Sequence, residues 1–217
     1  MRFIEVKDRD PPPDRKSLTG RNNCRDRNTH MSKKLCEMTL EELWQLFPIV
    51  LTEHKDYWAD IYAEESKRLK SVLPQGAELH HIGSTAINGI PAKPIIDILI
   101  AVDSIDSLKR AADILQKHGY TVMSSSEKRI SLNMGYTESG FAEKVFHVHL
   151  RLNGDTDEIY FRDYLNAHPE IAKEYERLKL RLWKKYEHDR DAYTNAKTDF
   201  VKKYTLAAKK KGECERC

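Results

Sequence analysis

The segment at residues 78–100 constrains the fold of this chain more than any other. It reads ELHHIGSTAINGIPAKPIIDILI: two apolar runs typical of strands, joined by a loop rich in small residues, glycine and proline. The second run is apolar except for Asp97. An unpaired buried carboxylate is costly, so we expect Asp97 to face a metal, a cation or water. The segment therefore predicts a phosphate-sized loop beside an acid carried on a strand.

The bulk properties favour one folded domain. The chain has 217 residues, of which 40% are hydrophobic, enough for a single core. It has no apolar run near the roughly 18 residues of a membrane span, and its charged start lacks the apolar stretch of a secretory signal. We therefore expect a cytoplasmic protein with no membrane partner.

Charge divides the chain into three parts. The net charge is +3, but residues 1–36 carry +5 and residues 205–217 carry +2, which leaves residues 37–204 at −4. We predict a disordered basic leader over 1–36, with Met31 as a candidate true start, a folded domain over 37–204, and a basic tail over 205–217. The acidic domain gives no strong nucleic-acid signal.

The four cysteines lie in or beside these two ends, at Cys24, Cys36, Cys214 and Cys217. The last two have CxxC spacing, which could form half of a zinc site. The spacing of the first two is wrong for a zinc ribbon, so reduced cysteines in disordered ends are the favoured interpretation.

The order of periodic segments predicts an α+β fold. Helical faces are expected over residues 58–72 and 104–118, strands within 120–152, and three further helices after residue 156. We predict a mixed sheet of about four to five strands flanked by helices, with a C-terminal helical bundle.

The strand expected at residues 145–152 has a polar face. With a period of two, His147, His149 and Arg151 point to one side, and an apolar set points to the other. The two histidines can share a face with Asp97 if the strands are neighbours.

Gly83 and Ser84 open the loop and are candidates for holding phosphate oxygens through backbone N–H groups and the Ser84 hydroxyl. The alternative is a tight turn with nothing bound. Charge for a phosphate or nucleotide could come from the basic residues Lys93, Arg151, Arg162 and Lys197. Asp97 could instead be a structural acid paired with Lys93 or Arg151.

A two-metal site would need two or three carboxylates, and the strand supplies one, because Ile95 and Leu99 flank Asp97 at the same-face positions. Asp97 with His81, His147 and His149 would suit Zn²⁺ or another transition metal. Alternatively, the histidines form hydrogen bonds to phosphate or backbone without any metal.

Several motifs in order resemble the GrpB family. The resemblance runs from about residue 38 to residue 203, and its motifs are HIGSTA at 81–86, AKPIIDI at 92–98, FHVHL at 146–150, FRDYL at 161–165 and AYTNAK at 192–197. It implies a nucleotidyltransferase (polymerase β-like) fold. Some members of the family are fused to dephospho-CoA kinases. A relation of this chain to that enzyme is therefore implied only by those fusions.

In that superfamily a Gly-Ser turn opens the site and a nearby strand carries Asp-x-Asp. By this resemblance Gly83 and Ser84 take the turn and Asp97 takes the second acid, while Ile95 stands where the first acid would be. His81, Lys93, His147 and His149 match family motifs without an implied role.

We therefore expect a pocket for a nucleotide or another phosphorylated small molecule. As an enzyme, the protein would transfer a nucleotidyl group from an NTP to an acceptor, with Ser84 and Asp97 as catalytic residues and Gly83, Ser84, Lys93 and Arg151 as ligand contacts. The cofactor would be a divalent metal, Mg²⁺ or Mn²⁺ before Zn²⁺, with a histidine replacing the missing acid. The alternative is a catalytically silent ligand-binding or folding-accessory module.

Overall fold

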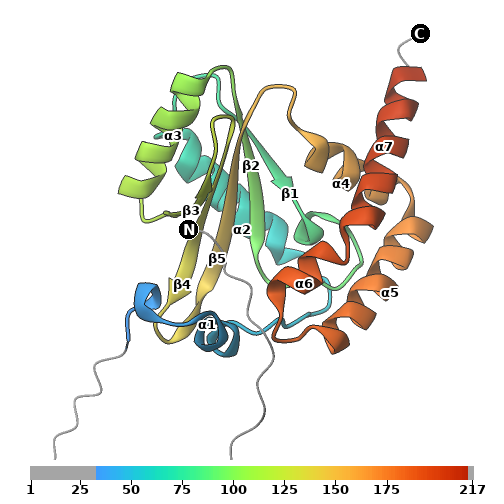
Figure 1. Ribbon diagram of the computed structural model, residues 1–217. Helices are drawn as coiled ribbons and strands as arrows, with labels where there is room; N and C mark the ends of the chain where they lie inside the picture. The colour runs from blue at the N-terminus through green and yellow to red at the C-terminus, as the bar shows by residue number, and fades with distance from the viewer. Residues whose placement is uncertain (1–32, 215–217) are drawn as a thin grey trace, which may run out of the picture.

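The computed structural model describes residues 33–214 and has a five-stranded sheet at its centre, in the order β1-β2-β5-β4-β3 (Figure 1). The strands are β1 (Glu78–Ile82), β2 (Ile96–Val102), β3 (Thr121–Ser125), β4 (Arg129–Thr137) and β5 (Gly140–Leu152). The helical elements are η1 (Leu35–Glu37), α1 (Leu40–Leu46), α2 (Tyr57–Lys70), η2 (Ser84–Ala86), α3 (Ile105–Lys117), α4 (Asp157–Ala167), α5 (Pro169–Lys185), α6 (Arg190–Asn195) and α7 (Thr198–Cys214).

The sheet is mixed, because β2 and β5 run parallel and the other neighbouring pairs run antiparallel. The α+β class, the mixed sheet and the C-terminal helices are therefore as predicted. Ile98, Ile100, Val148 and Leu150 are fully buried on the face that α2 and α3 cover. This is the main hydrophobic core, and burial of each such side chain contributes about 1.5–3 kcal/mol.

Local signals explain where the helices begin and end. Thr39 and Glu42 form the capping box of α1. Ser104 accepts a hydrogen bond from the Ser107 N–H and caps α3. Pro169 stands at the start of α5, where its missing N–H costs nothing.

A buried polar network links α2 to Tyr120, the residue that precedes β3. The Tyr120 hydroxyl donates to Glu65 Oε1 at 2.6 Å, and Arg68 donates to both oxygens of the same carboxylate. Burial raises the pKa of Tyr120, and the neighbouring Glu65 raises it further, so the phenol keeps its proton and remains a donor.

A second core joins the C-terminal helices to the loop between β1 and β2. Ile87 and Ile90 of the loop are buried against Phe161, Leu165 and Tyr175 of α4 and α5. In Figure 1 these helices lie beside β1, at the opposite end of the sheet from β3. The loop is therefore fixed by packing, not only by its own sequence.

The predicted boundary at residue 205 falls inside a helix. α7 continues without a break to Cys214, and its Lys209 forms an ion pair with Asp157 at the start of α4. The first part of the predicted tail is therefore helical and packed. The predictions for residues 1–32, including Met31 and Cys24, and for Cys217 lie outside the described residues; Cys36 is an exposed free thiol.

Among the described residues, none of the helices combines the length and the apolar composition that crossing a membrane requires.

Candidate functional site

A pocket of about 810 Å³ lies over the polar face of the sheet. Its walls come from the loop after β1, from β2 and β5, and from α4 to α7. The polar residues that carry its chemistry are Ser84, Lys93, Asp97, His147, His149, Lys179, Arg190 and Lys197.

Asp97 is the centre of this pocket. It is directly opposite His147 in the parallel pairing of β2 and β5. Its Oδ1 lies 3.1 Å from His147 Nδ1 and 3.6 Å from His149 Nε2. The predicted common face of Asp97 and the two histidines is therefore present.

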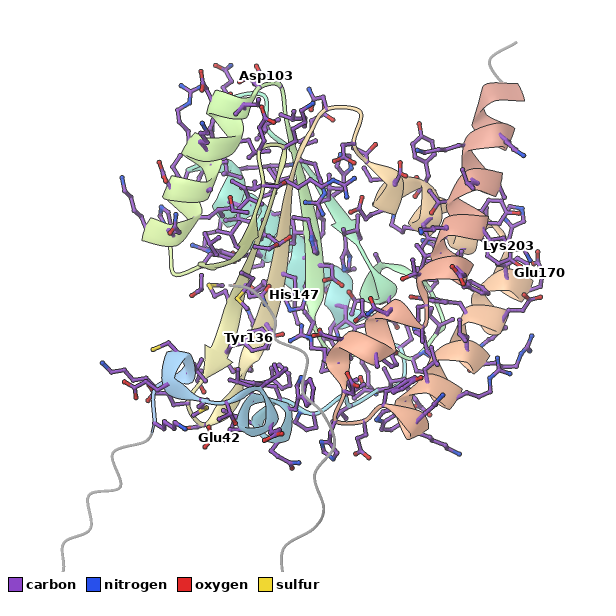
Figure 2. All side chains as sticks on the ribbon, viewed as in Figure 1. Glu42, Asp103, Tyr136, His147, Glu170 and Lys203 are labelled. Carbon is purple, nitrogen blue, oxygen red and sulfur yellow. The ribbon has the colours of Figure 1, made fainter. Side chains whose placement is uncertain are left out.

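The hydrogen bonds of His147 fix which ring nitrogen carries the proton. Arg190 Nη2 lies 3.2 Å from His147 Nε2, and a guanidinium can only donate. Nε2 must therefore be the unprotonated nitrogen. Its lone pair is shared between Arg190 and the Tyr136 hydroxyl, which lies 2.8 Å away. Figure 2 shows Tyr136 and His147 side by side on the sheet. His147 is then neutral, and its Nδ1–H donates to Asp97.

The electrostatics agree with this arrangement. Burial lowers the pKa of His147 and outweighs the opposing effect of Asp97, while Arg190 and Lys93 lower it further. For Asp97, burial alone would raise the pKa, but hydrogen bonds from His147 and His149 lower it well below the usual range. The pair is thus an ionised carboxylate with a neutral imidazole donor.

Gly83 allows the loop to approach Asp97. Its φ is +72°, and a Cβ built on it would lie 2.2 Å from Asp97 Oδ2. Only glycine combines that backbone conformation with such an approach. Asp97 Oδ2 therefore faces the Gly-Ser turn, while Oδ1 faces the histidines.

Ser84 follows directly and lines the pocket. Its side chain forms a hydrogen bond with Tyr175 of α5, and burial raises the pKa of Tyr175 to about 12, so the phenol stays neutral. Tyr175 thereby orients the Ser84 hydroxyl at the pocket wall.

Three cations gather beside Asp97. Lys93 and Lys197 both lie over the Tyr193 ring, with Nζ atoms 5.8 Å and 4.1 Å from its centroid. Burial lowers the pKa of Lys93 to about 7, with Arg190 and Lys197 lowering it further and Asp97 opposing them. Burial likewise lowers the pKa of Lys197 to about 8. This excess of positive charge over one carboxylate favours an anion.

Side chains of α4 and α5 hold the loop by its backbone. Arg162 Nη1 donates to the His81 carbonyl at 2.6 Å, and Lys173 Nζ donates to the Gly89 carbonyl at 3.0 Å. Asn166 accepts from the Asn88 N–H and donates to the Ala86 carbonyl, both at 3.0 Å. The loop that carries Ser84 is therefore preorganised by the C-terminal helices.

Lys179 of α5 is almost completely buried and donates to the Pro91 carbonyl. Its burial lowers its pKa to about 7, with Lys197 contributing in the same direction. Lys179 is thus already used to hold the loop.

Two residues predicted for the site lie elsewhere. His81 pairs with Ile98, so its side chain is on the opposite face of the sheet from Asp97; it stacks on Tyr62 and meets Thr85 Oγ1 at 3.1 Å. Burial lowers the pKa of His81 to about 4. Arg151 shares the face of His149, but it is buried and does not line the pocket. It pairs with Glu158 at 3.3 Å.

The donor set does not fit a divalent metal. Within residues 33–214, no group of three or more His, Cys, Asp or Glu side chains is arranged to hold a metal ion. Both ring nitrogens of His147 are occupied, and Ile95, at the position of the missing acid, is buried. The other pocket acids, Asp157 and Glu158, are paired with Lys209 and Arg151.

Arg190, Tyr136 and Tyr175 are site residues that the sequence interpretation missed. Tyr175 could have been found, because it is a further position at which the sequence resembles the GrpB family, as the loop does. Arg190 and Tyr136 carry no signal of this kind, since each meets His147 only through tertiary packing.

The family model described as GrpB protein matches residues 48–206. The Glutamate-rich protein GrpB of Alkalihalophilus pseudofirmus is 36% identical, over 70% of this chain and 91% of that protein. The UPF0157 protein YqkA of Bacillus subtilis is 35% identical over 78% of this chain, which spans about half of that protein's length.

Two solved structures are also similar. The crystal structure of conserved protein GrpB from Enterococcus faecalis has a TM-score of 0.65 and 30% identity, covering 75% of this chain and 98% of that one. A structure of the Cid1 poly(U) polymerase gives a TM-score of 0.44 and 12% identity, covering 72% of this chain and 51% of that one.

Proposed function

The chain belongs to the GrpB family, and we propose that its pocket binds a nucleotide or another small phosphorylated ligand. The observation that carries the proposal is the grouping of Lys93, Arg190 and Lys197 with Asp97 in the pocket that Gly83 and Ser84 also line. Such a group of cations, partly removed from water, carries a charge that a phosphate would neutralise.

The size and polarity of the pocket support a ligand as large as a nucleotide. Its volume of about 810 Å³ is in the range of roughly 300–1,000 Å³ that small-molecule sites occupy. Tyr193 and Phe161 add apolar surface for a base or another uncharged part of the ligand. The phosphates would take the cations and the Ser84 hydroxyl.

Nucleotidyl transfer is a second candidate, favoured by His149. This side chain is about one quarter exposed, lines the pocket and lies 3.6 Å from Asp97. An acceptor hydroxyl would form a bond to the α-phosphorus, pyrophosphate would leave with the bridging oxygen, and His149 would take the hydroxyl proton. The lysines and Arg190 would stabilise the charge that develops on the phosphates.

The binding proposal is tested with the full chain by calorimetric titration of ATP, GTP, CTP and UTP. We expect one of them to bind at one site per chain. Lys93→Met and Lys197→Met should each weaken binding roughly tenfold to a hundredfold, because each removes a charged contact worth about 1.5–3 kcal/mol. Lys109→Met, on the exposed face of α3, is the matched control and should bind like the wild type.

The same protein preparation can distinguish ligand binding from nucleotidyl transfer. Labelled NTP with candidate acceptors should release pyrophosphate if transfer occurs, and His149→Gln should abolish release without abolishing binding. Binding of an NTP without pyrophosphate release under every condition would support the ligand-binding role and contradict nucleotidyl transfer. No binding of any nucleotide, of inorganic phosphate or of pyrophosphate would contradict the proposal itself.

A further inference from the structure

We infer that this pocket neutralises its ligand's phosphate charge with Lys93, Arg190 and Lys197, and that it binds the ligand without a divalent metal. The inference rests on the proposed function and specifies it: the ligand is a free polyphosphate anion, not its Mg²⁺ complex. It is carried by the way in which His147 and Asp97 Oδ1 are already engaged.

Arg190 is the first reason. Its guanidinium donates to His147 Nε2 at 3.2 Å and lies over the Tyr136 ring, 5.6 Å from the centroid. It therefore occupies, with a positive charge, the position from which a cation would reach the imidazole. A divalent ion at the same nitrogen would have to displace Arg190 or remain beside it, against like-charge repulsion.

The engagement of Asp97 is the second reason. Oδ1 accepts from His147 and lies within 3.6 Å of His149, while Oδ2 lies against Gly83. A carboxylate whose Oδ1 already accepts from His147 has less charge available for Mg²⁺, which is a small ion that gives up its water reluctantly. The second acid that would restore the negative charge is replaced by buried Ile95.

The remaining cations complete the argument. Lys179 is committed to the Pro91 carbonyl, whereas Lys93 and Lys197 lie over the Tyr193 ring. Together with Arg190 they form a group of three basic side chains around one carboxylate, and a bound phosphate would favour the protonated form of both lysines. Three fixed cations match the charge of a di- or triphosphate, and they perform the role that a metal performs in an acid-rich site.

The test is a pair of ATP titrations of the full chain, one with excess EDTA and one with millimolar Mg²⁺, at equal ionic strength. We expect equal or tighter binding with EDTA, because Mg²⁺ cancels part of the charge that the three cations recognise. Arg190→Met should weaken binding with EDTA roughly tenfold to a hundredfold. Arg181→Met, an exposed arginine of α5, is the matched control.

Circular dichroism and the urea midpoint of Arg190→Met establish that the variant is folded. Arg190→Lys keeps the charge without the planar fork and should recover part of the affinity. Binding that occurs only with Mg²⁺ or Mn²⁺, or stoichiometric binding of either metal alone that Asp97→Asn removes, would overturn the inference and leave the proposed function intact. Binding under neither condition would instead contradict the proposed function.

Discussion

Gly83 and Asp97 are so close that a single added methyl group on Gly83 would lie 2.2 Å from the carboxylate oxygen Oδ2. The loop after β1 and the acid on β2 therefore form one unit, joined through a glycine with φ of +72°. The geometry requires both residues at once, which explains why the loop can present Ser84 to the same pocket as Asp97.

Replacing Gly83 with alanine should be costly for two separable reasons. Strain at positive φ costs of order 1–3 kcal/mol, and overlap with Asp97 should add about 1–3 kcal/mol. Gly89→Ala is the matched control, since Gly89 has φ of +68° but no atom within 4 Å of an added Cβ. Urea denaturation should show the larger loss for Gly83→Ala; equal losses would contradict the close approach. In an Asp97→Ala background the excess should fall, because the contacts with Oδ2 at 2.2 Å and Cγ at 2.9 Å are removed and only the contact with Cβ at 3.0 Å remains.

Tyr120→Phe should lower the free energy of unfolding by about 1–3 kcal/mol. The variant removes the 2.6 Å hydrogen bond to Glu65 and leaves the carboxylate with Arg68 alone. Tyr57→Phe, at an exposed tyrosine, is the control and should change stability by less than about 0.5 kcal/mol. Urea denaturation measures both variants. An equally small change for Tyr120→Phe would show that the network contributes nothing.

Stability should increase as the pH rises from about 7 to 9.5. Lys93 and Lys179 have pKa values lowered to about 7, and Lys197 to about 8, so between those values and about 10.5 the unfolded chain binds more protons than the folded one. The free energy of unfolding then rises by up to about 1.4 kcal/mol per pH unit for each full proton of difference.

Urea midpoints in phosphate-free buffer at constant ionic strength measure this slope. Lys179→Met should flatten it, because the variant removes one of the contributing groups. The exposed Lys109→Met should leave it unchanged. A stability that falls between pH 7 and 9.5 would contradict the lowered pKa values.

Asn166→Ala should loosen the loop that carries Ser84. It removes the two hydrogen bonds to the Asn88 N–H and the Ala86 carbonyl, and we expect a loss of about 1–2 kcal/mol. Hydrogen exchange of the loop amides should become faster, whereas the exposed Asn195→Ala should not change it. Unchanged exchange in Asn166→Ala would show that packing of Ile87 and Ile90 alone fixes the loop.

The alternation of polar and apolar residues was enough to place His147 and His149 on one face of their strand, because a strand has a period of two whatever its neighbours are. That this face is also the face of Asp97 depends on the pairing of β2 with β5. The same rule explains the error at His81. In the antiparallel register of β1 and β2, Ile82 pairs with Asp97, so His81 must point to the other face. Register depends on pairing between distant strands, and the sequence alone does not state it.

Arg190 shows a second limit. It is the first residue of the short helix α6, and nothing in its neighbours marks it as a site residue. It reaches His147 only because α5, α6 and α7 pack over the loop after β1. Contacts of this kind follow from tertiary packing, so the sequence predicted the loop, the acid and the histidines but not the cation that engages them.

The central claim is that a phosphorylated ligand lies between the Gly83–Ser84 turn and the cations above Asp97. A crystal structure of the full chain with a non-hydrolysable ATP analogue tests it most directly. We predict phosphate oxygens within hydrogen-bond distance of Ser84 Oγ and of at least two of Lys93, Arg190 and Lys197. Phosphates bound away from these four side chains, or a divalent ion inserted between His147 and the phosphates in place of Arg190, would contradict the account.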